Sequence, residues 1–293
     1  MSKLGSVELL INMKSRSGRR ALKQVLDTCD SNNISLTRVH KITDTGRLSA
    51  VLAGIRKRAP DTLITASGDG TVSDVVDYLA GTSIKLGFVP LGTTNNFARS
   101  LGVPLDIEAA VGTIARGQTR TIALGQAGDD FFANVAGVGM SARIARAVTP
   151  ERKQRFGRFA YALTALHILM THQPFFVQLK DKDGEFEAHF ETHQLIVANG
   201  RYHAGTEIAA DADLSHSELV VFKLGGPSRF SLIWHMLDFY FGKRRSVSHS
   251  AYFIGKNIYI QTSRPQPVEL DGEVKLETPL AVRVHADAVE VYC

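Results

Sequence analysis

The feature that most constrains this sequence is the regular alternation of strand-like and helix-like segments in its first part. Short apolar runs alternate with segments in which apolar residues recur every three or four positions, and these two periods are typical of strands and helices. The predicted strands are residues 7–12, 34–42, 62–66 and 84–90, and the predicted helices are residues 19–32, 48–58, 72–79 and a segment from about residue 97. This alternation predicts a parallel, Rossmann-like sheet with helices on both faces.

The pattern changes near residue 122, where short strands begin to follow one another with turns between them. The predicted strands are residues 122–124, 131–135, 175–180, 185–190, 194–198, 219–223, 251–254, 257–262 and 281–285, and predicted helices at 142–171 and 229–241 interrupt them. We therefore predict an α/β domain over residues 1–122 and a mainly antiparallel β-sandwich over residues 123–293. The prediction allows the last strand of the sandwich to return to the first domain and to join its sheet.

Composition narrows the class of protein. Of the 293 residues, 44% are hydrophobic and 22% charged, which is typical of a globular chain long enough for two domains. The longest apolar run, residues 159–170, is shorter than the roughly 20 residues that span a bilayer. Only Cys29 and Cys293 are present and the histidines lack metal-ligand spacing, so we expect neither a disulfide scaffold nor a zinc site. We also expect no nucleic-acid binding, because no recognition module is visible.

Three polar loops follow predicted strands. Ser67-Gly-Asp-Gly-Thr71 joins a strand to a helix, and its glycines let a ligand approach the backbone while the helix N–H groups face an anion. Asp69 would hold Mg²⁺ or orient a hydroxyl, although the same tripeptide also suits an ordinary turn with an Asp helix cap. Two further polar loops, Gly92-Thr-Thr-Asn-Asn96 and residues 12–18, each follow another predicted strand of the same sheet. Ligands bind at this edge of a parallel sheet, so the loops together predict a nucleotide triphosphate site.

These segments, with others further along the chain, resemble those of a known family. Residues 67–76 resemble the GGDGT signature of the diacylglycerol kinase catalytic domain, whose superfamily includes sphingosine, ceramide and bacterial lipid kinases. Residues 90–99 are similar to its PLGTxNDFAR segment, and residues 12–18 to its NPxSG loop. Residues 132–139, 157–161 and 268–274 resemble its strand into the second domain, its GKxAY helix and its DGE motif. The order of the segments is that of the family, which implies an NAD-kinase-like nucleotide domain.

The resemblance implies a lipid kinase that uses ATP and Mg²⁺. The residues implied for the ATP site are Asn12, Ser17, Gly18, Thr43, Ser67, Gly68, Asp69, Gly70, Thr71, Val72, Ser73, Gly92, Thr93 and Asn95. Asp69, Asp271 and Glu273 are the implied catalytic residues, and one of the last two would act as general base. An alcohol has a very high pKa, so a carboxylate that takes its proton assists the transfer. Without the other motifs, residues 271–273 would be better explained as a hairpin turn between strands.

Several positions depart from the family pattern. Met13, Asn96 and Ser141 replace a proline and two frequent aspartates, and His216 and Ser217 lie where many bacterial members hold a structural Mg²⁺. These departures leave the metal ligands unknown and two alternatives open. One is a non-catalytic regulator that binds nucleotide or lipid, and the other is a kinase of a soluble nucleotide, as in NAD kinases.

Basic residues next to apolar segments indicate a membrane surface. Arg143, Arg146, Arg152, Lys153, Arg155 and Arg158 precede the apolar residues 159–170, and residues 243–245 follow the apolar residues 234–241. Each such charge contributes about 1 kcal/mol on an anionic membrane, although a solvated helix face is an equal explanation. No signal peptide is visible, so we expect a cytoplasmic enzyme in transient contact with the membrane. Strand edges of the second domain also allow a homodimer.

Overall fold

The computed structural model describes residues 4–293 except 15, 148–163, 165–166, 185, 204, 227 and 229–251, and it describes no side chain at 16 and 17. In chain order the first elements are β1 (Val7–Asn12), α1 (Arg16–Ser31), β2 (Leu36–Ile42), the short 3₁₀ helix η1 (Thr45–Arg47), α2 (Leu48–Arg58), β3 (Thr62–Ser67), α3 (Asp69–Leu79), β4 (Lys85–Pro90), α4 (Asn96–Leu101), α5 (Ile107–Arg116) and β5 (Thr119–Ala127). The remaining elements are β6 (Asp130–Phe132), β7 (Val135–Gly139), α6 (Met140–Ala147), β8 (Phe175–Asp181), β9 (Glu187–Thr192), β10 (Gln194–Ala198), β11 (Tyr202–His203), β12 (Thr206–Glu207), β13 (Leu219–Leu224), β14 (Tyr252–Gly255), β15 (Asn257–Thr262), β16 (Pro267–Leu270), β17 (Glu273–Glu277) and β18 (Leu280–Tyr292).

The first part of the chain forms the predicted parallel sheet, in the order β2-β1-β3-β4. All six residues of β3 are buried, as expected for a strand covered on both faces. Apolar side chains of α2, α3 and α4 pack on one face around Phe88, and those of α1 and α5 pack on the other around Ile64. Because the strands are parallel, the loops that follow β1, β2, β3 and β4 share one edge of the sheet.

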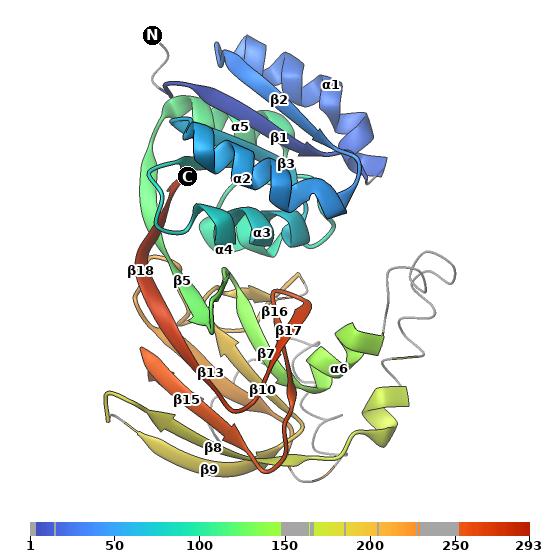
Figure 1. Cartoon of the computed structure of the whole chain (residues 1–293), viewed down its shortest axis with the longest axis vertical. Coiled ribbons are helices and arrows are strands. Elements are labelled where there is room, and N and C mark those ends of the chain that lie inside the picture. Colours follow the sequence, from blue (N-terminus) through green and yellow to red (C-terminus); the bar gives the residue numbers. More distant parts are fainter. Residues whose placement is uncertain are drawn as a thin grey trace.

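The second part forms the predicted β-sandwich. Six antiparallel strands in the order β14-β13-β10-β7-β16-β17 make one layer, and β15, β8 and β9 belong to the other. A core of alternate residues from both layers lies between them, including Val138, Leu195, Val221, Val177 and Ile260. In Figure 1 this sandwich lies below the α/β domain, with α6 beside the β16–β17 hairpin.

Two long strands, β5 and β18, run from one half of the molecule to the other (Figure 1). At its first end β18 pairs with β15, and at its last end Val291 pairs with Leu86 of β4 and with Arg120 of β5. The ladder is irregular between His285 and Val289, near Asp287 with a φ of 52°. The domain boundary near residue 122 stays a prediction, because β5 continues on both sides of that position.

Local structure differs from the sequence expectation at the strand predicted at 131–135 and at helix α5, and two further helix predictions are described only in part or not at all. The strand predicted at 131–135 is divided into β6 and β7, because the backbone N–H groups of Ala133 and Asn134 donate to the Asp271 carboxylate instead of a neighbouring strand. Helix α5 was absent from the prediction, although its Asp106 cap was a readable signal. Of the helix predicted at 142–171, the structure describes α6 and helical residues near 167–171, and the helix predicted at 229–241 lies outside the described residues.

Candidate active site

Two glycine-containing loops touch at the edge of the parallel sheet. A Cβ atom added to Gly92 would lie 2.9 Å from the Gly68 Cα atom, and one added to Gly68 would lie 3.2 Å from the Gly92 Cα atom. Real side chains rarely tolerate such distances, so glycine is needed for the loops after β3 and β4 to meet. Gly70 is different, since a Cβ atom there would meet nothing within 4 Å. The backbone at Gly70 therefore borders open space, beside the N-terminal turn of α3.

The Asp69 carboxylate joins these two loops. Its Oδ2 atom accepts a hydrogen bond of 2.6 Å from the Thr94 hydroxyl, and its Oδ1 atom accepts one of 3.2 Å from the backbone N–H of Phe97. Asp69 thus orders the start of α4 from the first turn of α3. Each oxygen keeps a second lone pair, so a further contact to a ligand is chemically open.

Asn95 orders the second loop from within. Its backbone has a φ of 47°, and its side chain bonds both backbone polar groups of Gly92, accepting from the Gly92 N–H at 2.8 Å and donating to the Gly92 carbonyl at 3.0 Å. The side chain is buried. Asn95 was predicted from the resemblance to lie in the nucleotide site, and the observed bonds give it a supporting place under that loop.

The loop after β1 meets the first glycine loop through side chains. The Asn12 amide donates a hydrogen bond of 2.8 Å to the Thr71 hydroxyl and accepts one of 2.9 Å from the backbone N–H of Lys14. Thr43 follows β2 at the same edge and is exposed, and the Lys14 ammonium reaches Thr45 at 3.3 Å. Most of the predicted nucleotide residues therefore lie together. Gly18 is buried in α1, whereas the side chain of Ser17 lies outside the described residues.

Asp271 lies opposite these loops, in the turn between β16 and β17. Its carboxylate accepts hydrogen bonds of 2.8–2.9 Å from the backbone N–H groups of Ala133, Asn134 and Val135, and one of 3.1 Å from the Ser73 hydroxyl of α3. Burial raises the pKa of Asp271, and the backbone donors oppose that rise because they stabilise the charged form. Both oxygens are engaged, so Asp271 links α3 of the first domain to the turn.

Glu273 follows in the same turn and is exposed. Its charge acts on Asp74 of α3, whose pKa rises to about 6 chiefly through burial and secondly through Glu273. Lys275, which lies two residues after Glu273 on β17, donates a hydrogen bond of 3.0 Å to the Asp130 carboxylate of β6. The sequence prediction missed Asp74, yet a signal existed, because it lies four residues after Gly70 and thus on the same face of the helix.

Glu269 is a second acidic group that the sequence prediction missed. It is only 2% exposed. Its Oε1 atom and the Ser141 hydroxyl both lie against Gly137, where an added Cβ atom would be only 2.6 Å from Oε1. Within the described part of the chain its Oε2 atom has no hydrogen-bond partner. Burial raises its pKa, against the opposing influence of nearby His203, of the Ser141 hydroxyl and of the Gly272 N–H. Glu269 thus adds a buried carboxyl behind the turn.

The acidic groups suit Mg²⁺ only as part of a shared site. Among the described residues, no group of three or more His, Cys, Asp or Glu side chains is placed to hold a metal ion. Mg²⁺ at kinase sites typically takes one or two protein carboxylates, and substrate phosphates and water complete its coordination shell. A bound ion would therefore need only one or two of these acidic side chains. In the turn at 213–217, Asp213 accepts from the Ser215 N–H at 2.9 Å and pairs with Arg201 at 3.9 Å.

Comparison with known proteins decides the family. Residues 6–127 match the model of the diacylglycerol kinase catalytic domain, and residues 134–293 match that of the YegS C-terminal NAD kinase β-sandwich-like domain. The chain belongs to the diacylglycerol kinase family. It is therefore a kinase of a lipid-kinase family. A diacylglycerol kinase of Bacillus subtilis is 29% identical over 261 residues, covering 87% of this chain and 84% of its own.

Solved structures confirm the fold. A diacylglycerol kinase from Bacillus anthracis superposes with a TM-score of 0.75 at 20% identity, covering 100% of this chain and 98% of its own. An NAD kinase from Archaeoglobus fulgidus in complex with ATP superposes with a TM-score of 0.53 at 11% identity, covering 98% and 93%. The predicted NAD-kinase-like α/β domain and β-sandwich are thus confirmed. Among the described residues, no helix has both the length and the apolar character needed to cross a membrane.

Proposed function

We propose that this kinase transfers the γ-phosphoryl group of ATP to the hydroxyl of a membrane lipid, such as diacylglycerol or a sphingoid or ceramide lipid. The observation that carries the proposal is the arrangement of two meeting glycine loops opposite the turn of Asp271 and Glu273. Open space at Gly70 lies beside the first turn of α3, where backbone N–H groups favour an anion. The names of the Bacillus relative and of the ATP-bound NAD kinase are consistent with both halves of the reaction.

The nucleotide would bind along the shared edge of the parallel sheet. Residues 67–73 would surround its phosphates, with Asn12, Gly18, Thr43, Thr93 and Asn95 shaping the site around them. Mg²⁺ would arrive with ATP and neutralise charge on the phosphates, with Asp69 as the candidate to hold it. Positioning and charge neutralisation supply most of the acceleration in phosphoryl transfer, so these loops would contribute more than any single base.

Glu273 is the better candidate for the general base. Both oxygens of the Asp271 carboxylate are occupied by backbone N–H groups and Ser73, whereas Glu273 is exposed at the tip of the turn. Glu273 would accept the proton of the acceptor hydroxyl as its oxygen bonds to phosphorus. Asp271 would position the turn, and Asp69 would hold the two glycine loops in register.

The acceptor would come from a bilayer, so the enzyme would work in transient contact with an anionic membrane, from the cytoplasm. Arg143 and Arg146 are the described members of the predicted basic stretch. The others, residues 152–158 and 243–245, lie outside the described residues, as do both predicted apolar neighbours except residues 164 and 167–170.

An acceptor panel tests the proposal. Labelled ATP would be offered with diacylglycerol, monoacylglycerol, sphingosine, ceramide and NAD in separate reactions, with Asp271→Ala as the control. We expect transfer to at least one lipid by the wild-type enzyme and little by the variant. Phosphorylation of NAD but of no lipid would instead indicate a soluble-nucleotide kinase. ATP binding without any transfer would indicate a non-catalytic regulator.

A further inference from the structure

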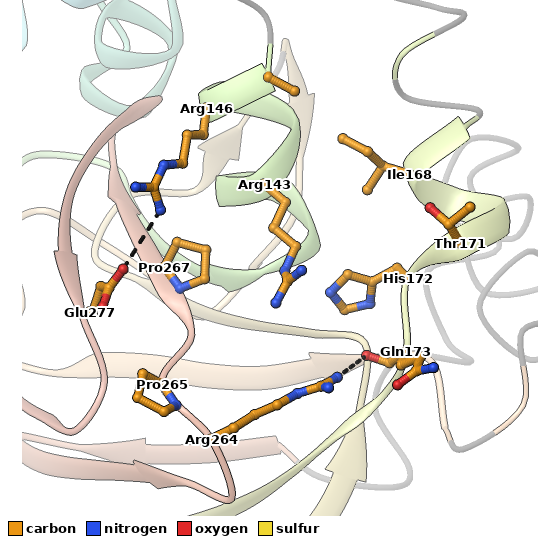
Figure 2. A pocket seen from close by; sticks show the side chains of 11 residues that line it. Arg143, Arg146, Ile168, Thr171, His172, Gln173, Arg264, Pro265, Pro267 and Glu277 are labelled. Carbon is orange, nitrogen blue, oxygen red and sulfur yellow. Dashed lines mark hydrogen bonds and ion pairs between the residues drawn. The ribbon is translucent and has the colours of Figure 1, made fainter.

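A cavity of about 540 Å³ opens on the sandwich between α6, the segment at residues 168–173 and the β16–β17 hairpin. Figure 2 shows the side chains of Arg143, Arg264 and His172 pointing toward its centre, with Arg146 and Glu277 at one side. The volume is within the range of pockets that bind small organic ligands. Nothing in the proposed phosphoryl transfer uses this cavity.

The charge in the cavity is positive. Three arginines line it against one glutamate, Glu277, which pairs with Arg146 at 3.6 Å through two well-exposed side chains. A pair so exposed to water is weak and releases its partners readily. Arg143 and Arg264 lack even that neutralising contact within the described residues. Among the residues that the structure describes, two guanidinium charges therefore face the cavity without a carboxylate paired to them.

The guanidinium groups also have donors to spare. In the described part of the chain, Arg143 directs one nitrogen to the Gln266 side chain at 3.3 Å, and Arg264 directs one to the carbonyls of Gln173 and Pro174 at 3.3 and 3.5 Å. A guanidinium carries five N–H donors in a planar fork that matches the oxygens of a phosphate. Within the described ranges, most donors of both arginines thus have no partner and can bind a ligand.

His172 adds no positive charge to the cavity at neutral pH. Burial, together with Arg143, His193 and Arg264, lowers its pKa to about 4, so the imidazole is neutral at pH 7. Its Nδ1 atom lies 3.1 Å from that of His193. The positive charge that attracts an anion consequently belongs to the arginines.

Exposed apolar side chains flank the same segments. Met170, next to Thr171 of the cavity wall, is 54% exposed, and Phe176 is 48% exposed. The backbone of Phe176 pairs with that of Ser263, the neighbour of Arg264. Basic side chains beside exposed apolar ones are typical of a surface that meets lipid head groups and the adjoining acyl region.

The cavity and the proposed catalytic turn share one strand. β17 begins at Glu273 in the turn and ends at Glu277 in the cavity wall. Four residues of an extended strand span about 13 Å, so an anion bound by the cavity arginines would lie well away from the Glu273 carboxylate that is proposed to act on the acceptor hydroxyl. A ligand of the cavity would thus be a different molecule from the acceptor.

We propose that this cavity binds the phosphate head group of an anionic membrane phospholipid, which is not phosphorylated and which holds the β16–β17 turn at the bilayer surface. The arginines bind the phosphate, and the exposed side chains of Met170 and Phe176 contact the first carbons of the acyl chains. The proposal rests on the proposed function only in taking a membrane as the source of the ligand.

Vesicle sedimentation without ATP or acceptor tests the site independently of catalysis. The full chain is mixed with vesicles of phosphatidylcholine, alone or with phosphatidylglycerol. The double variant Arg143→Gln/Arg264→Gln is compared with Arg38→Gln/Arg283→Gln, which removes the same charge from exposed positions on β2 and β18. We expect the affinity for the mixed vesicles to fall roughly tenfold for each cavity arginine. General surface attraction accounts for at most about fivefold for each control arginine.

Equal losses in the two double variants would overturn the proposal, as would wild-type protein that binds both kinds of vesicle alike. Inorganic phosphate is added in parallel, and release of the protein at low concentrations of it would assign the cavity to a free anion instead. Should the cavity variant not fold, the wild-type chain is titrated with short-chain phosphatidylglycerol below its micelle concentration. Saturable binding at one site is expected there, and absence of binding would refute the site.

Discussion

Asp271 and Glu273 are two residues apart in one turn, yet the fold surrounds their carboxylates differently. Asp271 accepts three backbone N–H bonds and one hydroxyl bond, while Glu273 is exposed to solvent. A carboxylate with filled hydrogen-bond capacity fixes geometry, and one with free lone pairs can take a proton. Substitutions that keep size but remove charge should separate these two roles.

For Glu273→Gln we expect kcat to fall by roughly 10²–10⁴, because the proton acceptor is lost while the turn is kept. The melting temperature should change little, since the side chain is exposed. Steady-state kinetics with the best lipid of the panel, together with calorimetry, would measure both quantities. Retention of near-full activity would transfer the role of base to another group, with Asp74 the first to examine.

Asp271→Asn should have the opposite profile. An amide keeps one acceptor oxygen but turns an N–H group toward backbone donors, so we expect a loss of stability on the order of 2–3 kcal/mol. Urea unfolding of the wild type and the variant would measure it. Stability equal to that of the wild type would mean that the four hydrogen bonds contribute little to holding the turn.

At the level of single residues, the sequence predicted which segments gather but seldom what each side chain does. Asp69 and Asn95 were readable as loop residues because glycine and strand ends surround them. Their bonds to Thr94, Phe97 and Gly92 depend on how two loops fold against each other, and no local pattern encodes that. Glu269 was hidden in an apolar strand, because its burial arises only when β16 packs beside β7.

At the scale of the elements, the segment that joins β3 to the first turn of α3 contains two glycines, Gly68 and Gly70, whose surroundings differ. Gly68 allows the close approach to Gly92, whereas Gly70 borders open space and imposes no packing demand on its neighbours. Propensity alone would favour alanine at position 70, inside the first turn of α3. If the nucleotide binds as proposed, its phosphates would occupy the space where a Cβ atom at position 70 would lie.

Gly70→Ala should accordingly weaken ATP binding, by roughly tenfold or more, while leaving stability unchanged or raised by about 0.5–1 kcal/mol. Gly112→Ala in α5 is the matched control, because a Cβ atom there also meets nothing within 4 Å. Nucleotide titration by calorimetry and thermal unfolding would give both values. If both variants bind ATP as the wild type does, the phosphates do not lie against Gly70.

The division of the predicted strand 131–135 shows the limit of pattern reading for elements. Apolar periodicity describes which face a segment buries, and it is silent on where its N–H groups donate. Here a carboxylate from a turn more than 130 residues later takes three consecutive N–H groups and ends the strand. Parallel and antiparallel sheets, in contrast, followed from sequence because helix crossovers and short turns impose them.

At the scale of the whole molecule, stability should depend on pH through the ion pair between the buried Glu8 and the solvent-exposed Arg58. Glu8 of β1 is bound by Arg58 at 2.8 Å and by His40 at 2.7 Å. The Arg58 hydrogen bond is the main cause that lowers the pKa of Glu8 from 4.5 to about 2. Because the folded pKa is depressed, this stabilisation is complete above the unfolded value of 4.5 and is lost as the pH falls toward 2.

We expect the wild type to lose about 3 kcal/mol of unfolding free energy from this residue between about pH 5 and pH 2. Glu8→Gln should be less stable than the wild type at neutral pH, and the difference should shrink as the solution is acidified. Urea unfolding of both proteins at several pH values would measure the difference. A gap that is independent of pH would mean that Glu8 contributes packing and no charge interaction.

The pairing of β18 has a consequence for biosynthesis. While the ribosome is still translating the sandwich, β4 and β5 have emerged but the strand that lies between them does not yet exist. At about 5–20 residues per second, translation from the end of β5 to the end of β18 takes roughly 10–30 s. During that interval the nascent α/β domain has an open edge at β4, the kind of surface that other strands bind. Slow synthesis or a shortage of chaperones should therefore harm this domain first, although it is encoded first.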